Sequence, residues 1–293
     1  MSAAAARRRA RRRWTPYLLS APLLLLLILL LLVPLVATLL LSFHSFGMYK
    51  GIEDVYRLDN YIDILTDSYF HGVFLRTMRI ALLVTVLSAL LGAPEAYVLS
   101  RMREPWRGVF LLVVLGPLLI SVVSRTLGWA LLFGSTGLVN QALVALGLVG
   151  EPVAFMYSET GVAIALTHVL LPFMVISVWA SLQRLDPQVA NAAVSLGAGP
   201  AMIFRRVVLP QVMPGILSGA IIVFALAASA FATPAIIGGR RLKVVATLAY
   251  DEFLNTLNWP LGAAVAVLLV LIILAITVGC GRLVERRYAQ IFE

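Results

Sequence analysis

The sequence has few charged residues and a single cysteine, and these shortages exclude several classes of protein. Only 13% of its 293 residues are Asp, Glu, Lys or Arg, whereas 61% are hydrophobic and the mean hydropathy is +0.97. A soluble domain of this length needs more polar residues to cover its surface. The one cysteine, Cys280, excludes an internal disulfide framework and a cysteine-rich metal site. We therefore expect an integral membrane protein.

Motifs that would give the chain a chemistry of its own are also missing. No Gly-x-x-x-x-Gly-Lys-Ser/Thr sequence occurs, so the chain is not expected to bind ATP in the P-loop manner. His-Glu-x-x-His is absent, and no Ser-His-Asp grouping is evident. We expect no catalytic residue, no metal and no cofactor in this chain, and hence no enzyme. Channel-filter sequences and an inverted repeat with broken helices are not seen either.

Long hydrophobic runs dominate what the sequence does contain. A helix that crosses the hydrocarbon core needs about 20 mostly apolar residues. Six stretches meet this requirement: Tyr17–Leu41, Val73–Leu99, Val109–Phe133, Thr160–Leu182, Pro214–Ile236 and Leu261–Leu283. Their length and their lack of alternation exclude a closed β-barrel. The predicted fold is all-α, with a six-helix membrane domain over residues 17–283, an Arg-rich tail over 1–16 and a C-terminal tail over 284–293.

Lysine and arginine are distributed unevenly about these stretches. An Arg-rich segment precedes the first stretch, which is too long for a signal peptide and has no small-residue cleavage site. With a cytoplasmic N-terminus, the inner segments hold 15 of the 23 Lys and Arg, and the positive-inside rule favours this orientation. We expect both termini in the cytoplasm. The bilayer and its lipids, rather than nucleic acid, then account for the net charge of +9.

The segment between the fourth and fifth stretches differs from the other loops. Asp186 is a favourable N-cap, and Pro187 fits the first turn of a helix. The sequence predicts a short helix over Val189–Leu196, a break at Gly197, and a second helix over Ala201–Val208. From composition alone, this segment is either an amphipathic connector resting on the membrane or a helix–turn–helix element that contacts another protein.

This segment resembles the EAA loop of ABC-importer permeases. The matching residues are Asn191, Ala192, Ala193, Gly197, Val207, Leu209 and Pro210. Asn191 stands where the family usually has Glu, which puts a charge-dependent contact at that point in question. In the family the loop, here at about residues 185–213, is a coupling helix that docks onto a cytoplasmic ATPase.

Shorter matches extend the resemblance over most of the chain and favour the spermidine/putrescine-type branch. They are Arg125 with Trp129, Gly137–Asn140, Leu171–Met174, Phe231–Pro234, Gly238 with Gly239, and Asn258–Pro260. The resemblance implies a bacterial inner-membrane permease that forms the path for a small solute such as a polyamine. It also implies an ATPase dimer that holds ATP and Mg, a second and different permease chain, and a periplasmic solute-binding protein. The alternatives are an ion-gradient-driven secondary transporter and a membrane scaffold.

Three polar residues inside the predicted spans are candidates for the translocation path. Arg125 either serves the path or a gate, or extends its charge toward the interface as an anchor. His168 either lines the path or forms a bond within the bundle. For Glu95 we favour an interfacial ion pair with Arg101 or Arg103 over a contact in the path.

Overall fold

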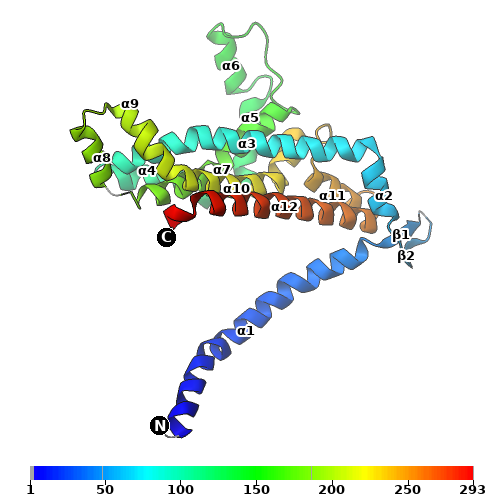
Figure 1. Ribbon diagram of the computed structural model, residues 1–293. Helices are drawn as coiled ribbons and strands as arrows, with labels where there is room; N and C mark the ends of the chain where they lie inside the picture. Colours follow the sequence, from blue (N-terminus) through cyan, green and yellow to red (C-terminus); the bar gives the residue numbers. More distant parts are fainter. Residues whose placement is uncertain (1–2, 48, 186, 293) are drawn as a thin grey trace.

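The computed structural model describes residues 3–47, 49–185 and 187–292, and it is mostly helical (Figure 1). Six helical regions are long and apolar enough to cross a membrane, which confirms the predicted fold class. Five long helices supply most of them: α1 (Ala3–Leu41), α3 (Ser68–Arg101), α7 (Glu159–Leu182), α10 (Leu209–Ala228) and α12 (Trp259–Phe292). The sixth region, which includes α5 (Val122–Phe133), differs from its prediction.

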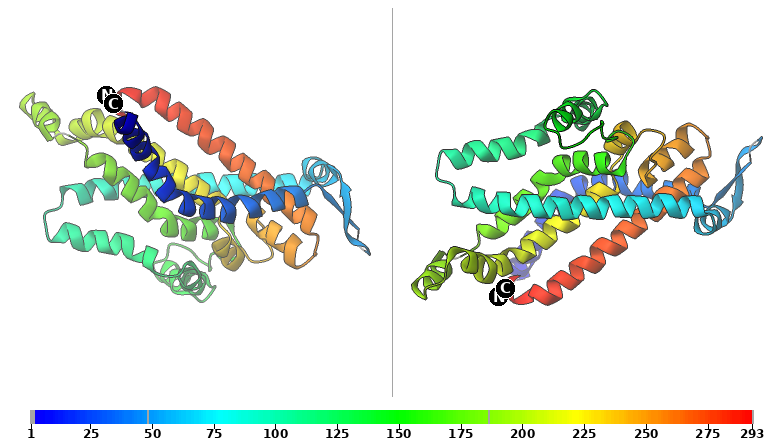
Figure 2. Two further views of the ribbon diagram at one scale, coloured as in Figure 1. Left: turned by 90° about the horizontal axis from the view of Figure 1, so that it is seen from below. Right: turned by 90° about the horizontal axis from the view of Figure 1, so that it is seen from above.

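Helix α7 lies at the centre of the bundle, between α3 and α10 (Figures 1 and 2). Its apolar residues surround the helix rather than forming one stripe, as expected of a helix buried on most sides. Met174, near its middle, is fully buried. Glycines on both neighbours face α7: a Cβ atom on Gly92 of α3 or on Gly219 of α10 would lie within 3 Å of the Met174 side chain. Small residues therefore allow these three helices to pack closely.

Helix α1 diverges from the bundle along most of its length (Figure 1). Its span, Leu19–Leu41, consists mainly of leucine, and most of these leucine side chains are exposed. Lipid tails are as apolar as leucine, so this surface suits a bilayer without a protein neighbour.

The third predicted span, Val109–Phe133, is wrong as a continuous helix. The chain forms α4 (Trp106–Leu115), a 3₁₀ turn (Gly116–Leu119) and then α5, with Ile120 extended between them. Pro117 explains the break, because a proline lacks the N–H that a continuing helix would require and its ring collides with the preceding turn. A further helix, α6 (Leu138–Ala145), follows α5 and projects from the bundle (Figure 1).

The fifth predicted span ends earlier than expected. Helix α10 stops at Ala228 instead of continuing to Ile236, and a π-helical turn (Pro234–Gly238) follows after a short bend. The loop before α10 contains α8 (Pro187–Ser195), α9 (Pro200–Ile203) and a π-helical turn (Phe204–Val208) that leads directly into α10. We call the end of the bundle that carries α8 and α9 the loop end.

The opposite end, which we call the strand end, contains a hairpin and two short helices that lie outside the predicted spans. Strands β1 (His44–Gly47) and β2 (Gly51–Tyr56) pair antiparallel. Helix α2 (Asp59–Thr66) precedes α3, and α11 (Val245–Leu254) precedes α12. Strand pairs and short helices carry a weak hydrophobic pattern, and so they were missed beside the long apolar spans.

Candidate functional site

The helix pair α8–α9 projects beyond the other helices at the loop end (Figures 1 and 2). Gly197 connects the two helices with a φ of +78°, a conformation that other residues rarely adopt, so the expected break lies where the sequence placed it. The candidate N-cap, Asp186, lies outside the described residues. Asn191 belongs to α8, but its side chain also lies outside the described part of the structure.

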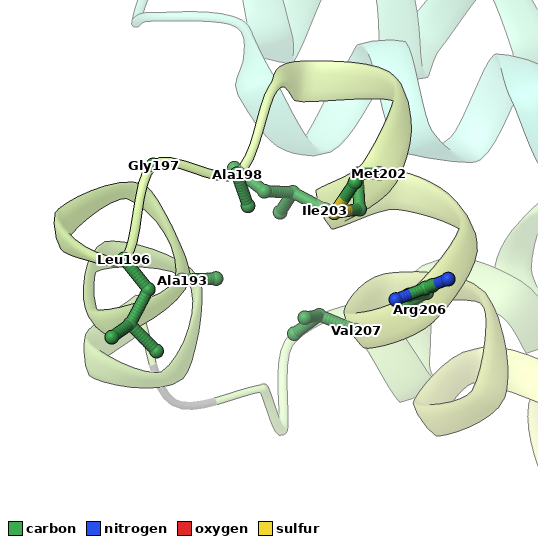
Figure 3. Close-up of a pocket in the computed structure, with 8 residues that line it drawn as sticks. All are labelled: Ala193, Leu196, Gly197, Ala198, Met202, Ile203, Arg206 and Val207. Atoms are coloured by element: carbon green, nitrogen blue, oxygen red, sulfur yellow. The ribbon is translucent and has the colours of Figure 1, made fainter.

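The two helices enclose a small open pocket of about 370 Å³ (Figure 3). It is lined by Ala193, Leu196, Gly197, Ala198, Met202, Ile203, Arg206 and Val207. Ala192 and Ala193 leave space around α8, and Arg206 supplies a charge at the rim. Leu209 and Pro210 do not line this pocket, because they form the first turn of α10. Pro210 has no N–H to donate, and the π-helical turn ends two residues before it, at Val208.

A second cavity lies beside α7 in the body of the bundle and has a volume of about 480 Å³. Arg125 of α5, Phe173 of α7 and the segment Phe231–Thr233 line it, together with Leu118, Val122, Leu166, Val169, Leu170, Leu226 and Ala230. Three of the short sequence matches, which lie far apart along the chain, therefore meet at one cavity. Among the described residues that line it, Arg125 is the one that carries a charge.

Hydrogen bonds fix the elements that surround this cavity. Thr126 and Thr233, both buried, bond to each other through their hydroxyls at 3.1 Å and so connect α5 to the segment after α10. Trp129 Nε1 donates to His168 Nδ1 at 3.1 Å, although the His168 ring stays exposed. His168 thus forms a bond within the chain, at an exposed position of a helix that is mostly buried.

The preferred interpretation of Glu95 is wrong. Glu95 is half-buried in α3, and no ion pair joins it to Arg101 or Arg103 in the part of the chain that the structure describes. Helix α3 continues to Arg101, and residues six positions apart point to different sides of a helix. Arg101 instead stacks over the Tyr97 ring at 5.3 Å. Glu95 is not among the residues that line the Arg125 cavity.

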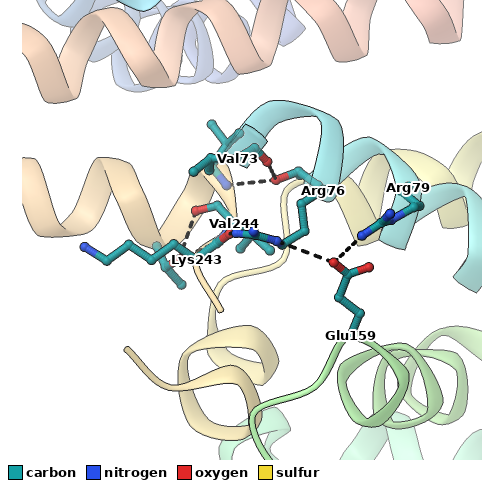
Figure 4. A network of polar contacts seen from close by, with 9 residues as sticks. Val73, Arg76, Arg79, Glu159, Lys243 and Val244 are labelled. Carbon is teal, nitrogen blue, oxygen red and sulfur yellow. Dashed lines mark hydrogen bonds and ion pairs between the residues drawn. The ribbon is translucent and has the colours of Figure 1, made fainter. Parts of the chain in front are cut away.

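A polar network at the strand end was not anticipated from the sequence (Figure 4). Arg76 and Arg79 of α3 both pair with Glu159, the first residue of α7. Arg76 Nη1 also donates to the carbonyl of Lys243 at 3.0 Å. Lys243 Nζ contacts Asp251 at 2.5 Å, and this hydrogen bond raises the pKa of the Lys243 ammonium above its ordinary value. The network connects α3, α7 and the segment before α11, and no local pattern marks partners so distant in sequence.

Comparison with known proteins identifies the chain. Residues 3–290 match the family described as the binding-protein-dependent transport system inner membrane component. The chain belongs to this family. A spermidine/putrescine transport system permease protein of Salmonella typhimurium is 30% identical over 264 residues, which cover 89% of this chain and 92% of that protein. A molybdenum transport system permease protein of Mycobacterium bovis is 31% identical over 74% of this chain and 80% of its own.

Solved structures agree with the family on the fold. A bacterial ABC transporter involved in the import of the acidic polysaccharide alginate contains a chain that superposes with a TM-score of 0.75 at 18% identity. The alignment covers 96% of this permease and 99% of that chain. This permease is therefore a multi-pass inner-membrane transport protein with the fold of an ABC-importer subunit. Among its described residues, no group of three or more His, Cys, Asp or Glu is placed to hold a metal ion.

The ion pairs of Glu159 yield a prediction about the stability of this permease. We expect Glu159→Gln to destabilise it by about 1 kcal/mol, since two arginines lose a half-buried carboxylate that solvent only partly screens. The thermal midpoint in nanodiscs should fall by about 2–4 °C. Because salt screens exposed ion pairs, the difference should shrink at high ionic strength. The control is Glu53→Gln, which breaks the exposed pair with Lys50. Equal midpoints for the two variants at low salt would contradict this assignment.

Proposed function

We propose that this permease is the membrane-spanning subunit of an ATP-driven importer, and that α8–α9 is the coupling element that docks onto a cytoplasmic ATPase dimer. The observation that carries the proposal is the projecting helix pair at the loop end, with its glycine turn and its small-residue face (Figure 3). A short helix rich in alanine allows another protein to approach the backbone closely. ATP and Mg are held by the ATPase, and this chain transmits the motion.

The placement of charge supports a cytoplasmic loop end. The start of α1, the end of α12 and the α8–α9 pair all lie toward the same end of the molecule (Figures 1 and 2). The segment Arg7–Arg13 belongs to the start of α1. The acidic residues Glu53, Asp54 and Asp59 lie at the strand end. By the positive-inside rule, the loop end and both termini face the cytoplasm.

We propose a small organic cation of the polyamine class as the solute, because the matched permease of Salmonella is named for spermidine and putrescine. A second, related permease chain completes the path, and a periplasmic solute-binding protein delivers the solute to the strand end. The acidic residues at that end attract cations toward the entrance. ATP binding and the loaded binding protein favour different states of the bundle. This difference allows them to change the side of the membrane to which the path opens.

The proposal is tested by uptake of radiolabelled putrescine into proteoliposomes that contain the complete complex. We expect uptake to require ATP, to stop when the catalytic glutamate of the ATPase is replaced by Gln, and to be unchanged by ionophores that collapse ion gradients. Uptake that persists without the ATPase and disappears with the gradient would establish a secondary transporter instead. Absence of any solute flux from a complete, ATP-hydrolysing complex would favour a scaffold.

A further inference from the structure

The cavity beside α7 contains a cationic group that lacks a counter-charge. The Nε and Nη1 atoms of Arg125 are buried, and neither has a hydrogen-bond partner among the described residues. The remaining lining is apolar except for Thr233, whose hydroxyl contacts that of Thr126. A charged side chain within a membrane-spanning helix is costly, and such residues usually pair with another ionisable group or with backbone carbonyls. This arginine has no such pair within the described part of its own chain.

The chain cannot readily supply the missing anion. Two acidic residues lie inside spanning helices, Glu95 of α3 and Glu285 of α12, and no ion pair connects either of them to Arg125 in the described part of the chain. Glu159, at the start of α7, is already paired with two other arginines. The counter-charge must therefore come from another molecule. Access is available, because Val122 and Phe231, which line the cavity, are 40% and 39% exposed.

We propose that the Arg125 cavity is a carboxylate-binding site, an inference that rests on the proposed function. A guanidinium presents parallel N–H donors that match the two oxygens of a carboxylate, and the low polarity of the cavity strengthens such a pair. The surrounding geometry is fixed: the hydroxyl contact between Thr126 and Thr233 and the Trp129–His168 hydrogen bond hold α5 against its neighbours. The helix that carries Arg125 is therefore already held in place before a partner binds.

Two sources of a carboxylate fit this chemistry. One is an Asp or Glu side chain of the second permease. A cationic solute that binds this side chain would compete with Arg125 and release the acid from the ion pair. The other is a carboxylate on the transported solute itself. A polyamine has no carboxylate and would be repelled by Arg125. The two sources therefore differ in what the loss of Arg125 changes: the assembly of the subunits, or the binding of an acid-bearing solute.

The test compares Arg125→Gln with Arg240→Gln, which removes the same charge from a loop position outside the cavity. Two properties are measured on the assembled complex in nanodiscs. One is the temperature at which the permease subunits separate. The other is equilibrium binding of 4-aminobutanoate and of putrescine, two probes with four-carbon chains in which a carboxylate of the first replaces an aminomethyl group of the second. Circular dichroism and monodispersity of the isolated Arg125→Gln chain verify that it folds, and Arg125→Lys should recover part of any loss.

If the carboxylate belongs to the second permease, we expect Arg125→Gln to lower the temperature at which the subunits separate by about 5 °C, because the substitution leaves a buried acid unpaired. If the carboxylate belongs to the solute, we expect Arg125→Gln to leave the separation temperature unchanged. The same variant should bind 4-aminobutanoate at least about tenfold more weakly and putrescine as tightly as before. If Arg125→Gln matches Arg240→Gln in both measurements, the carboxylate site does not exist. If the wild-type chain forms a complex with neither an ATPase nor a second permease, the proposed function itself fails, and this inference fails with it.

Discussion

Replacing Gly197 by valine is expected to uncouple ATP hydrolysis from solute uptake while the permease still inserts and folds. Gly197 has a φ of +78° between α8 and α9, and a β-branched residue is strongly disfavoured there. The strain of about 1–3 kcal/mol can be relieved only by reorienting α8 relative to α9. Since the pocket between these helices has about 370 Å³ and an open side, α8 can move without disturbing the core. If α8 is the docking element proposed above, a misplaced α8 no longer transmits the motion of the ATPase.

Gly199→Val is the matched control for this prediction. Gly199 lies two residues further on, has open space around it as Gly197 does, and has no positive φ. Uptake and phosphate release are measured together in proteoliposomes that contain the complete complex. The solute imported per ATP hydrolysed should fall about tenfold for Gly197→Val, the equivalent of about 1.4 kcal/mol, and should change little for Gly199→Val. Equal coupling in the two variants would show that the turn at Gly197 does not position the docking helix.

The sequence predicted this turn because its cause is local. A glycine after a short helix of small residues indicates a left-handed C-terminal residue, and no distant contact is needed to place it. The long spans were predictable for a related reason, since the bilayer imposes a length and a composition on each one. The break at Pro117 was missed because the apolar run continues on both sides of the proline, and hydropathy alone does not register a lost backbone N–H.

The arrangement around Arg125 was only partly predictable. The sequence marked Arg125, Phe173 and Phe231 separately, yet nothing in it indicated that all three line one cavity. Such convergence depends on how α5, α7 and α10 cross, which is set by the side chains between them and not by periodicity. The pairing assigned to Glu95 failed for a similar reason. Closeness in sequence suggested an ion pair, but Glu95 and Arg101 point to different sides of α3, and Arg103 lies beyond the end of that helix.

The close packing of α10 on α7 is expected to make Gly215→Ala strongly destabilising. A Cβ atom at Gly215 would lie 2.2 Å from the Ser181 hydroxyl, 2.7 Å from Ser181 Cβ and 2.9 Å from the Ser177 carbonyl oxygen. The hydroxyl can rotate away, but the other two atoms are fixed to the backbone of α7. The helices must therefore separate, and overpacking of this kind costs about 1–3 kcal/mol. We expect the thermal midpoint of the permease in nanodiscs to fall by about 2–12 °C.

Gly279→Ala provides a control with the opposite expected sign. Gly279 lies in α12, and a Cβ atom added to it would have nothing within 4 Å, so alanine there should stabilise the helix by about 0.5–1 kcal/mol. A rise in the midpoint for both alanine variants would mean that α7 and α10 are not in close contact. Second-site changes at Ser181 then identify the colliding atom. In the Gly215→Ala background, Ser181→Gly removes both Ser181 contacts and should recover part of the loss. Ser181→Ala removes only the hydroxyl and should recover less, because the Cβ contact at 2.7 Å remains.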